Sequence, residues 1–311
     1  MNSFNGDPVL QATWLYYQDG LNQTEIAKVM EVSRVTVVKY LQTAREKGFV
    51  QINLDQKSFS SIDKALSIKS KFNLKNVMII PEGDANMHPR TRLASAGAMY
   101  LSQVVQDNDV VGVAWGRTIH QMGQIMTPKA LNNVTVLQML GSMPSQPDFT
   151  TIESSSLIAN KLSGTCVNLH VPAVVSSSRL AMELQAEPII RANFATLTKC
   201  NRALFVVGSC RNENPLIRCG VLTAEEMEAY RELGAVGVIC GRFYDKEGQP
   251  VLGQLDPRVL GISLAQLRHI TQRIFIAGGE NNYEATRGAI LGGYVSDLII
   301  DEGTAEYLMQ C

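Results

Sequence analysis

The chain has 311 residues, of which 45% are hydrophobic and 18% are charged, and its formal net charge at pH 7 is −1. This length exceeds one typical domain, so it predicts two domains and a sizeable buried core. The near-zero net charge excludes a generally basic nucleic-acid coat, and any contact with nucleic acid must come from a local patch.

The cysteines and the N-terminus indicate the compartment. The six cysteines show no paired short spacing and no accompanying histidine cluster. We therefore expect free thiols in a reducing compartment, no metal site and no cofactor. The N-terminus lacks the pattern of a signal peptide, and no apolar run reaches membrane length, so we expect a cytoplasmic protein without membrane contact.

Two short helices are predicted at the start of the chain. The first begins at Asp7-Pro8, where Asp is the N-cap and Pro occupies the first helical position, and it ends near Gly20. The second begins after Asn22, because Asn22 and Glu25 have the spacing of a capping box.

A third helix follows after a tight turn. Ser33 is its predicted N-cap, and it runs to Lys47, before Gly48. The turn has Glu31 where Gly is common, and we expect Glu31 to stay helical while Val32 makes the turn. Two helices joined in this way predict a helix-turn-helix, although an ordinary helix hairpin has the same outline.

The faces of the third helix favour the helix-turn-helix. Val37, Tyr40, Leu41 and Ala44 share one face at helical spacing, which leaves a polar and valine-containing face outward. Such a face can contact base edges, thymine methyls and phosphates in the major groove. The predicted DNA-binding residues are Ser33, Arg34, Val35, Thr36, Lys39, Gln42, Arg45 and Lys47.

The charge of this region is modest. Residues 28–47 hold five basic and two acidic side chains, a net charge of +3. Phosphate contacts must therefore be few per subunit, and an oligomer is needed for useful affinity. We expect double-stranded operator DNA as a partner and a homo-oligomer, either a dimer or a tetramer.

The segment after the third helix predicts a domain boundary. Alternating apolar residues at 49–54 indicate a short strand, or wing, that closes a winged-helix domain near residue 57. We expect domains at 1–57 and 58–311, the second opening with a linker helix within 58–75. This helix could form a dimer contact, and its positions three and four apart are Ile62, Ala65, Leu66, Lys69 and Phe72.

The rest of the chain alternates short apolar strands with longer helices, which predicts a mostly parallel sheet covered on both faces. The predicted helices are 90–106, 150–162, 223–233 and 283–292. The predicted strands are Asn76–Ile80, Asp109–Ala114, Val134–Gln138, Ala203–Val207, Val236–Cys240, Arg273–Ala277 and Asp297–Ile300.

Four of these strands end beside glycine, at the edge where open α/β sheets bind ligands. Glycine lets the backbone approach a ligand, and the amides that open the next helix favour an anion or polar hydroxyls. We predict one cleft, although a glycine after a strand is often only a turn. The segments are Trp115-Gly116-Arg117-Thr118, Leu140-Gly141-Ser142, Gly278-Gly279-Glu280 and Asp301-Glu302-Gly303.

Taken together, these motifs resemble the SorC-type sugar-responsive transcriptional regulators. The resemblance covers nearly the whole chain, through TEIAKVMEVSRVTVVKYLQTAREKGFV, VGVAWGRT, GAVGVICGRFYD and IAGGENNYEATRGAILGGYVSDLIIDEGTA. It implies a winged helix-turn-helix head on an α/β effector domain similar in fold to ribose-phosphate isomerases and glucosamine-phosphate deaminases. It also implies a dimer or tetramer and a sugar-derived effector, often phosphorylated.

Two positions depart from the family pattern. Val238 replaces an acidic residue and Asn282 replaces a lysine, which in the family look like the hydroxyl-binding carboxylate and the phosphate-binding cation. Either neighbours such as Arg117, Arg242 or Asn281 compensate, or the effector is an unphosphorylated sugar or polyol that suits a neutral amide. The effector-binding residues that the resemblance and the strand ends indicate are Trp115, Gly116, Arg117, Thr118, Gly141, Val238, Glu280, Asn282 and Asp301.

Two other functions are open. An isomerase or deaminase would need a base in the cleft, such as Asp301 or Glu302, but acidic residues after a strand more often cap the next helix. An effector-independent DNA binder would not explain the large domain after the head. We therefore expect a regulator without catalytic residues that controls a carbohydrate catabolic operon.

Overall fold

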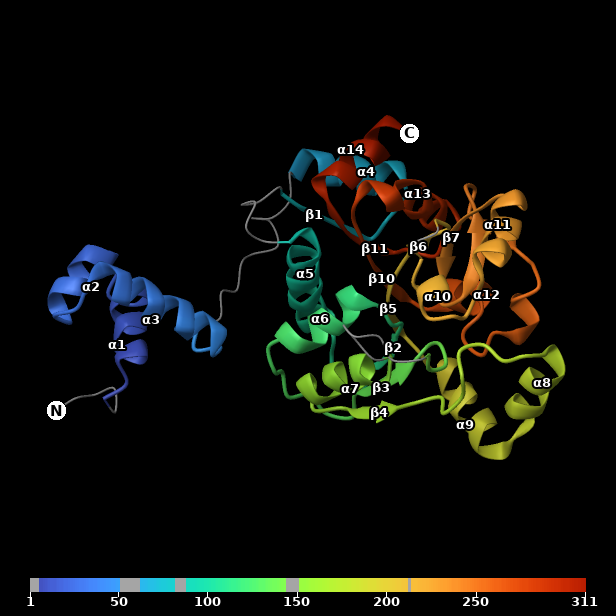
Figure 1. Cartoon of the computed structure of the whole chain (residues 1–311), viewed down its shortest axis with the longest axis horizontal. Helices are drawn as coiled ribbons and strands as arrows, with labels where there is room; N and C mark the ends of the chain where they lie inside the picture. The colour runs from blue at the N-terminus through green and yellow to red at the C-terminus, as the bar shows by residue number, and fades with distance from the viewer. Residues whose placement is uncertain (1–5, 51–61, 82–87, 144–150, 212–213) are drawn as a thin grey trace. The chain divides into compact units, whose positions relative to one another are not determined.

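The chain divides into two compact units, Met1–Leu54 and Asp55–Cys311 (Figure 1). The structure, a computed structural model, describes residues 6–50, 62–81, 88–143, 151–211 and 214–311. The expected strand at 49–54, apart from its first two residues, and the expected linker at 56–61 lie outside the described residues.

The head is built from three helices, as predicted: α1 (Pro8–Tyr17), α2 (Gln23–Val29) and α3 (Arg34–Glu46). Asp7 caps α1, Asn22 and Glu25 form the capping box of α2, and Ser33 Oγ accepts a hydrogen bond from the Thr36 amide at 3.1 Å. These caps satisfy amides that the helices leave without partners. The helices enclose a small apolar core of Ala12, Ile26, Val37 and Leu41.

The turn between α2 and α3 differs from the expectation for Glu31. Glu31 itself leaves the helix, with φ of 54° in the left-handed region. Its amide bonds to the Lys28 carbonyl and the Val32 amide to the Ala27 carbonyl, the pattern that usually ends a helix at glycine. A side chain in this region costs about 1–2 kcal/mol, so the turn is strained.

The strain at Glu31 predicts a stabilising substitution. Glu31→Gly should raise the free energy of unfolding of the head by about 0.5–1 kcal/mol, because the relief of strain exceeds the entropic cost of glycine. Urea unfolding followed by Trp14 fluorescence in a Trp115→Phe background measures this change. The control Glu31→Ala removes the charge but keeps Cβ; an equal gain in both variants would contradict the explanation.

The larger unit contains a seven-stranded parallel sheet in the order β1-β11-β10-β5-β2-β3-β4 (Figure 1). The mostly parallel sheet is confirmed, and β4 is a strand that the sequence pattern did not predict. The strands are β1 (Asn76–Ile80), β2 (Val110–Val113), β3 (Thr135–Gln138), β4 (Thr165–Val167), β5 (Arg202–Val206), β10 (Gln272–Ala277) and β11 (Asp297–Asp301).

Helices cover both faces of this sheet, because its strands are apolar on both sides. One apolar cluster includes residues of α5 (Pro89–Val104), α6 (Arg117–Ile125) and α7 (Thr151–Lys161). The opposite cluster includes residues of α4 (Ile62–Lys71), α12 (Leu264–His269), α13 (Tyr283–Leu291) and α14 (Glu302–Gln310). On α4, Ala65 and Ile68 are buried in that cluster, while Ile62 and Leu66 remain exposed.

The predicted strand at 236–240 does not join the parallel sheet, so that part of the interpretation was wrong. It forms β7 (Ala235–Ile239) of a separate antiparallel sheet, ordered β6-β7-β8-β9, with β6 (Gly208–Ser209), β8 (Arg242–Asp245) and β9 (Pro250–Val251). The reason is the two-residue turn Cys240-Gly241, with φ of 48° and 74°. A turn this short joins only antiparallel neighbours, since a parallel strand needs a long crossover.

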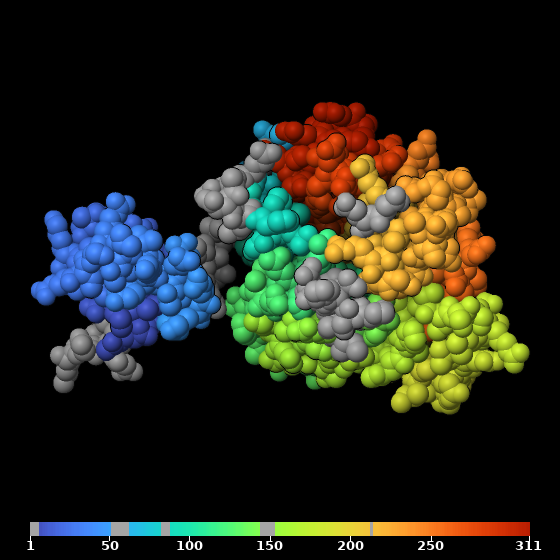
Figure 2. All heavy atoms as spheres, in the orientation of Figure 1, coloured from blue at the N-terminus to red at the C-terminus, as the bar shows by residue number. Residues whose placement is uncertain are grey.

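Four further helices complete the larger unit: α8 (Ser178–Ala186), α9 (Pro188–Leu197), α10 (Pro215–Arg218) and α11 (Ala224–Glu232). Helices α8 and α9 pack against each other, and in the space-filling view they project from the body of this unit as a lobe (Figure 2). Their shared core includes Ala181 and Ile190.

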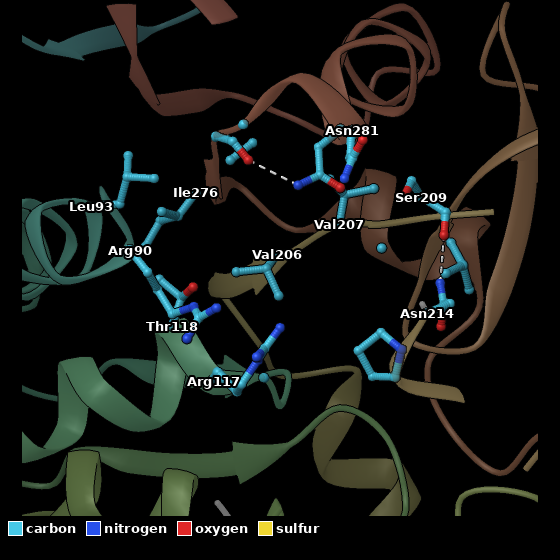
Figure 3. Close-up of a pocket in the computed structure, with 18 of the residues that line it drawn as sticks. Arg90, Leu93, Arg117, Thr118, Val206, Val207, Ser209, Asn214, Ile276 and Asn281 are labelled. Carbon is cyan, nitrogen blue, oxygen red and sulfur yellow. Dashed lines mark hydrogen bonds between the residues drawn. The ribbon is translucent and has the colours of Figure 1, made fainter. Parts of the chain in front are cut away.

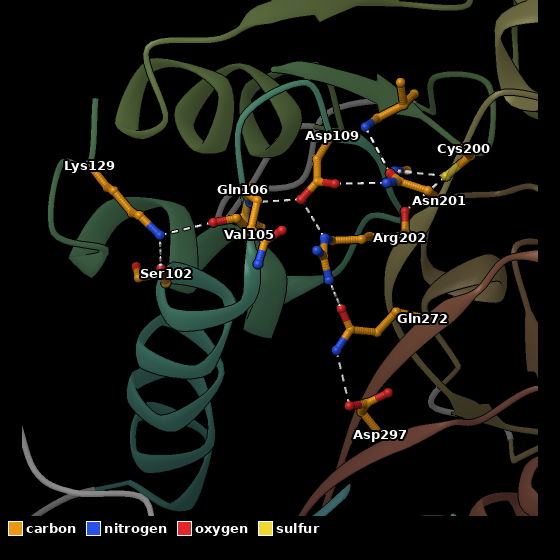
Figure 4. A network of polar contacts seen from close by, with 12 residues as sticks. Ser102, Val105, Gln106, Asp109, Lys129, Cys200, Asn201, Arg202, Gln272 and Asp297 are labelled. Carbon is orange, nitrogen blue, oxygen red and sulfur yellow. Dashed lines mark hydrogen bonds and ion pairs between the residues drawn. The ribbon is translucent and has the colours of Figure 1, made fainter. Parts of the chain in front are cut away.

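A row of polar side chains joins the amino ends of five adjacent strands, and we call it the polar ladder: Asn76, Asp297, Gln272, Arg202 and Asp109. Asn76 and Gln272 donate to Asp297 Oδ1 at 2.7 and 3.0 Å. Arg202 donates to Gln272 on one side and to Asp109, at 2.5 Å, on the other (Figure 4). Each rung therefore links one strand to the next in the observed order.

Asp297 is the most heavily bonded member of the polar ladder. It is fully buried, and burial alone would raise its pKa, but donation from Ser296, Tyr100, Asn76 and Gln272 outweighs burial and lowers the pKa below its ordinary value. The carboxylate therefore stabilises the fold above about pH 4, and this stabilisation is lost as the pH falls through the lowered pKa.

This dependence gives a stability prediction. Asp297→Asn should lower the free energy of unfolding of the larger unit by about 1–3 kcal/mol at pH 7, because it removes the charge that strengthens these hydrogen bonds and replaces the oxygen that accepts from Ser296 with a donor. The loss should shrink below about pH 4. Urea unfolding followed by Trp115 fluorescence in a Trp14→Phe background measures both effects. Asp63→Asn, at an exposed position, is the control; equal losses in the two variants would refute the role of the ladder.

Candidate functional site

A cavity of about 790 Å³ lies at the carboxyl ends of β2, β5, β10 and β11. Strands β2 and β5 are neighbours, but the chain goes on from β2 to β3 on one side and from β5, through the antiparallel sheet, to β10 on the other. The crevice at such a switch point is where open α/β sheets bind ligands. Three of the four predicted glycine segments contribute to the described lining of this cavity, and Leu140-Gly141-Ser142 does not.

The turn from β2 into α6 forms one wall of the cavity. Residues 115–118 line it, and Gly116 precedes α6 without any side-chain cap on that helix. The first amides of α6 are therefore available to an anion or a hydroxyl. Gly116 has φ of 156°, which side chains rarely adopt, and a Cβ there would also press on Val206 Cγ2 at 3.0 Å, so the backbone conformation favours glycine.

The loop after β10 and the end of β11 form the facing wall. Asp301 Oδ2 accepts from the Gly279 amide at 2.7 Å, and its Oδ1 accepts from the Thr304 amide at 2.9 Å, which caps α14. Asn282 Nδ2 donates to the Gly278 carbonyl at 2.9 Å. Asp301 and Asn282 therefore hold the shape of the loop, while Glu280 is exposed at the cavity.

Eight of the nine predicted effector-binding residues line this cavity: Trp115, Gly116, Arg117, Thr118, Val238, Glu280, Asn282 and Asp301. Gly141 is not among the described lining residues. Its amide donates to the Leu260 carbonyl at 2.8 Å, and a Cβ there would lie 2.5 Å from the Pro172 oxygen. The close passage of two backbone segments therefore explains this glycine without a ligand.

Sequence reasoning missed several lining residues, among them Arg90 on α5, Arg211 after β6, and Asn214. Figure 3 shows Arg90, Arg117 and Thr118 on one side of the cavity and Asn281 and Asn214 on the other. Arg211 Nη1 donates to Asn281 Oδ1 at 2.7 Å, which joins two loops at the cavity. Arg211 and Asn214 could have been predicted as lining residues, because they also follow a predicted strand, Ala203–Val207.

The charges of the described lining are biased toward cations. Arg90, Arg117 and Arg211 stand against Glu280 and Asp301. Arg242, which the sequence left as a possible substitute for the missing lysine, is directed elsewhere: it donates to the carbonyls of Asp256 and Val259. The cavity can therefore bind an anionic group with guanidinium groups and helix amides.

The outward face of α3 is the candidate nucleic-acid interface. Val35, Lys39, Gln42, Arg45 and Lys47 are exposed, and Val35 exposes 67% of its surface. Two predicted contact residues already make hydrogen bonds within the head. Ser33 caps α3, and Thr36 is half-buried with its hydroxyl 2.8 Å from Ser33 Oγ.

Arg34 begins this face. Its Nε donates to Gln23 Oε1 at 3.4 Å, which leaves both terminal nitrogens of the guanidinium for a base edge or a phosphate.

Among the described helices, none has the length and apolar character that crossing a bilayer requires.

The comparisons with known proteins agree with this arrangement. A sequence profile of the family described as "Putative sugar-binding domain" matches residues 56–310. The uncharacterized transcriptional regulator YjhU of Escherichia coli K12 is 68% identical over 99% of this chain and 96% of its own length. The deoxyribonucleoside regulator of Bacillus subtilis is 33% identical over 96% of each chain.

Among solved structures, the full-length sorbitol operon regulator SorC of Klebsiella pneumoniae superposes with a TM-score of 0.78 at 22% identity, over 97% of each chain. The helix-turn-helix head and the α/β cavity define a DNA-binding transcriptional regulator with a sugar-binding domain. The chain belongs to this sugar-binding family of transcriptional regulators, and the resemblance to the SorC-type proteins is confirmed.

Proposed function

We propose that the protein controls a carbohydrate catabolic operon by binding its operator through α3 and a sugar-derived anionic effector in the cavity. The observation that carries this proposal is an arginine-lined cavity at the switch point of a sugar-binding domain joined to a helix-turn-helix head. Effector binding then changes the affinity for the operator.

An anionic effector is supported by three arginines of the cavity, although position 282 is the neutral Asn282. Arg90, Arg117 and Arg211 line the cavity, and the open amino end of α6 adds partial positive charge. Guanidinium groups match both phosphate and carboxylate geometry. The arginines can therefore replace the missing lysine as the cations that bind the anion. Asn282 alone would suit a neutral polyol, but one of its amide hydrogens already bonds to the Gly278 carbonyl.

We propose that the cavity binds and does not catalyse. Asp301, the nearest candidate for a base, accepts the Gly279 amide on one oxygen and the Thr304 amide and hydroxyl on the other. Removing any of these bonds would disturb the loop after β10 or the start of α14. The regulator names of the relatives support the same conclusion.

The operator-binding proposal predicts different effects for two basic residues of the head. Arg34→Ala should cost about 1–3 kcal/mol at one base pair, because the guanidinium makes a bidentate contact with guanine. Lys47→Ala should weaken all sequences alike and reduce the salt dependence. Fluorescence anisotropy with operator variants at fixed salt separates the two, and an unchanged operator affinity in Arg34→Ala would rule the contact out.

The effector proposal predicts the response of the cavity to loss of a cation. Arg117→Ala should weaken binding of a phosphorylated or carboxylated sugar by about tenfold or more, since charge-assisted hydrogen bonds contribute about 1.5–3 kcal/mol. Uncharged sugars of the same skeleton should change little. Asn282→Lys should strengthen binding of the phosphorylated forms. Titration followed by Trp115 fluorescence in a Trp14→Phe background tests this; a wild type that prefers the uncharged sugar would defeat the anionic effector.

We also propose that α4 contributes to a homo-oligomer, because Ile62 and Leu66 are 53% and 56% exposed on one side of this helix. Leu66→Glu should weaken self-association by at least tenfold, since it places a charge in an apolar contact. Sedimentation of the full chain measures this effect. Met182→Glu on α8, at an equally exposed apolar position, is the control; similar weakening in both would argue against a specific contact through α4.

A further inference from the structure

The cavity has an apolar wall that the anionic end of an effector does not use, and we define it by four residues: Trp115, Leu216, Val238 and Cys240. All four line the cavity, and all four belong to, or pack against, the apolar cluster around the antiparallel sheet. The charged lining residues lie on other segments: Arg90 on α5, Arg117 at the start of α6, Arg211 after β6, Glu280 after β10 and Asp301 at the end of β11. The two walls therefore differ in chemistry.

Val238 is held firmly in the apolar wall. It exposes only 6% of its surface and lies on β7, between Gly208 on β6 and Phe243 on β8. A Cβ at Gly208 would already lie 3.1 Å from Val238 Cγ1, so there is little space for the valine to move toward β6.

A hydroxyl placed against the apolar wall would lose water, and none of the four side chains of this wall is a strong acceptor. The neighbouring Asn214 is held in place at both ends: its Nδ2 donates to the Ser209 carbonyl at 2.7 Å, and its Oδ1 accepts from the Leu216 amide at 2.8 Å, which leaves one Nδ2 hydrogen and one Oδ1 lone pair. Burial raises the pKa of the Cys240 thiol to about 12, so it is neutral at pH 7 and accepts only weakly. A methylene or methyl group meets no such cost at this wall.

We propose that the effector is a deoxy sugar derivative, whose anionic end meets the arginines and whose deoxygenated carbon rests on Val238. This proposal rests on the anionic effector proposed above, and it adds the part of the ligand that Val238 selects. Sites that merely lack a hydroxyl partner discriminate by about ten- to a hundredfold, so the expected preference is of that order.

The test uses the full-length protein and pairs of anionic sugars that differ by one hydroxyl. The pairs are ribose 5-phosphate with 2-deoxyribose 5-phosphate, glucose 6-phosphate with 2-deoxyglucose 6-phosphate, and gluconate with its 2-deoxy and 3-deoxy forms. Dissociation constants come from Trp115 fluorescence in a Trp14→Phe background and are checked by thermal shift. Comparison of the phosphate pairs with the carboxylate pair also shows whether the anionic group of the effector is a phosphate or a carboxylate.

We expect the deoxy member of the pair that binds to bind at least tenfold more tightly. Val238→Thr, which adds a hydroxyl at nearly constant volume, should reduce that ratio by about tenfold. The control Val251→Thr, in the same apolar cluster but not lining the cavity, should leave the ratio unchanged.

Equal or tighter binding of the hydroxylated member to the wild type would overturn the deoxy preference and leave the anionic effector in place. Should the Val238→Thr chain fail to fold, the wild-type ratio still decides. Binding of none of these anions, with uncharged sugars binding instead, would overturn the proposed effector class and the deoxy preference with it.

Discussion

The polar ladder along the amino ends of five strands is the constraint on which the larger unit depends; its two aspartates are buried and its other three side chains are half-buried. Strands that are apolar on both faces have little in their side chains to distinguish one neighbour from another. Hydrogen bonds from Asn76 and Gln272 to Asp297, and from Arg202 to Asp109, are satisfied only in one strand order. Buried polar groups can provide specificity of this kind, and here the order that they favour brings β2, β5 and β10 together as neighbours.

The same order creates the cavity at the opposite ends of those strands. Because β5 lies between β2 and β10, the turns that follow all three strands surround one space. Glycines allow this crowding: a side chain at Gly116 would press on Val206, and one at Gly278 would overlap the Asp301 carboxylate. The polar ladder thus lies at the amino ends of these apolar strands, and the cavity lies at their carboxyl ends.

Local sequence patterns predicted the elements well, but they could not predict how distant elements meet. Helix caps such as Asn22 and Ser33, and apolar strands, depend on residues that are close in the sequence. They could therefore be predicted from the sequence. The strand at β7 has the same apolar composition as its parallel counterparts, and only the Cys240-Gly241 turn reveals its antiparallel pairing. Arg90 lies on a helix whose position relative to β2 is a tertiary fact, which is why its place in the cavity was missed.

The contrast between the two walls has a consequence for how regulators of this kind diversify. Arg90 and Arg117 lie on α5 and α6, whereas Val238 lies on β7 of the antiparallel sheet, so a substitution at Val238 need not disturb these two arginines. A duplicated gene could acquire a new effector by changing a few positions of the small antiparallel sheet while it keeps the arginines that we propose bind the anion. Its operator would stay the same throughout, since the recognition helix folds around a core of its own.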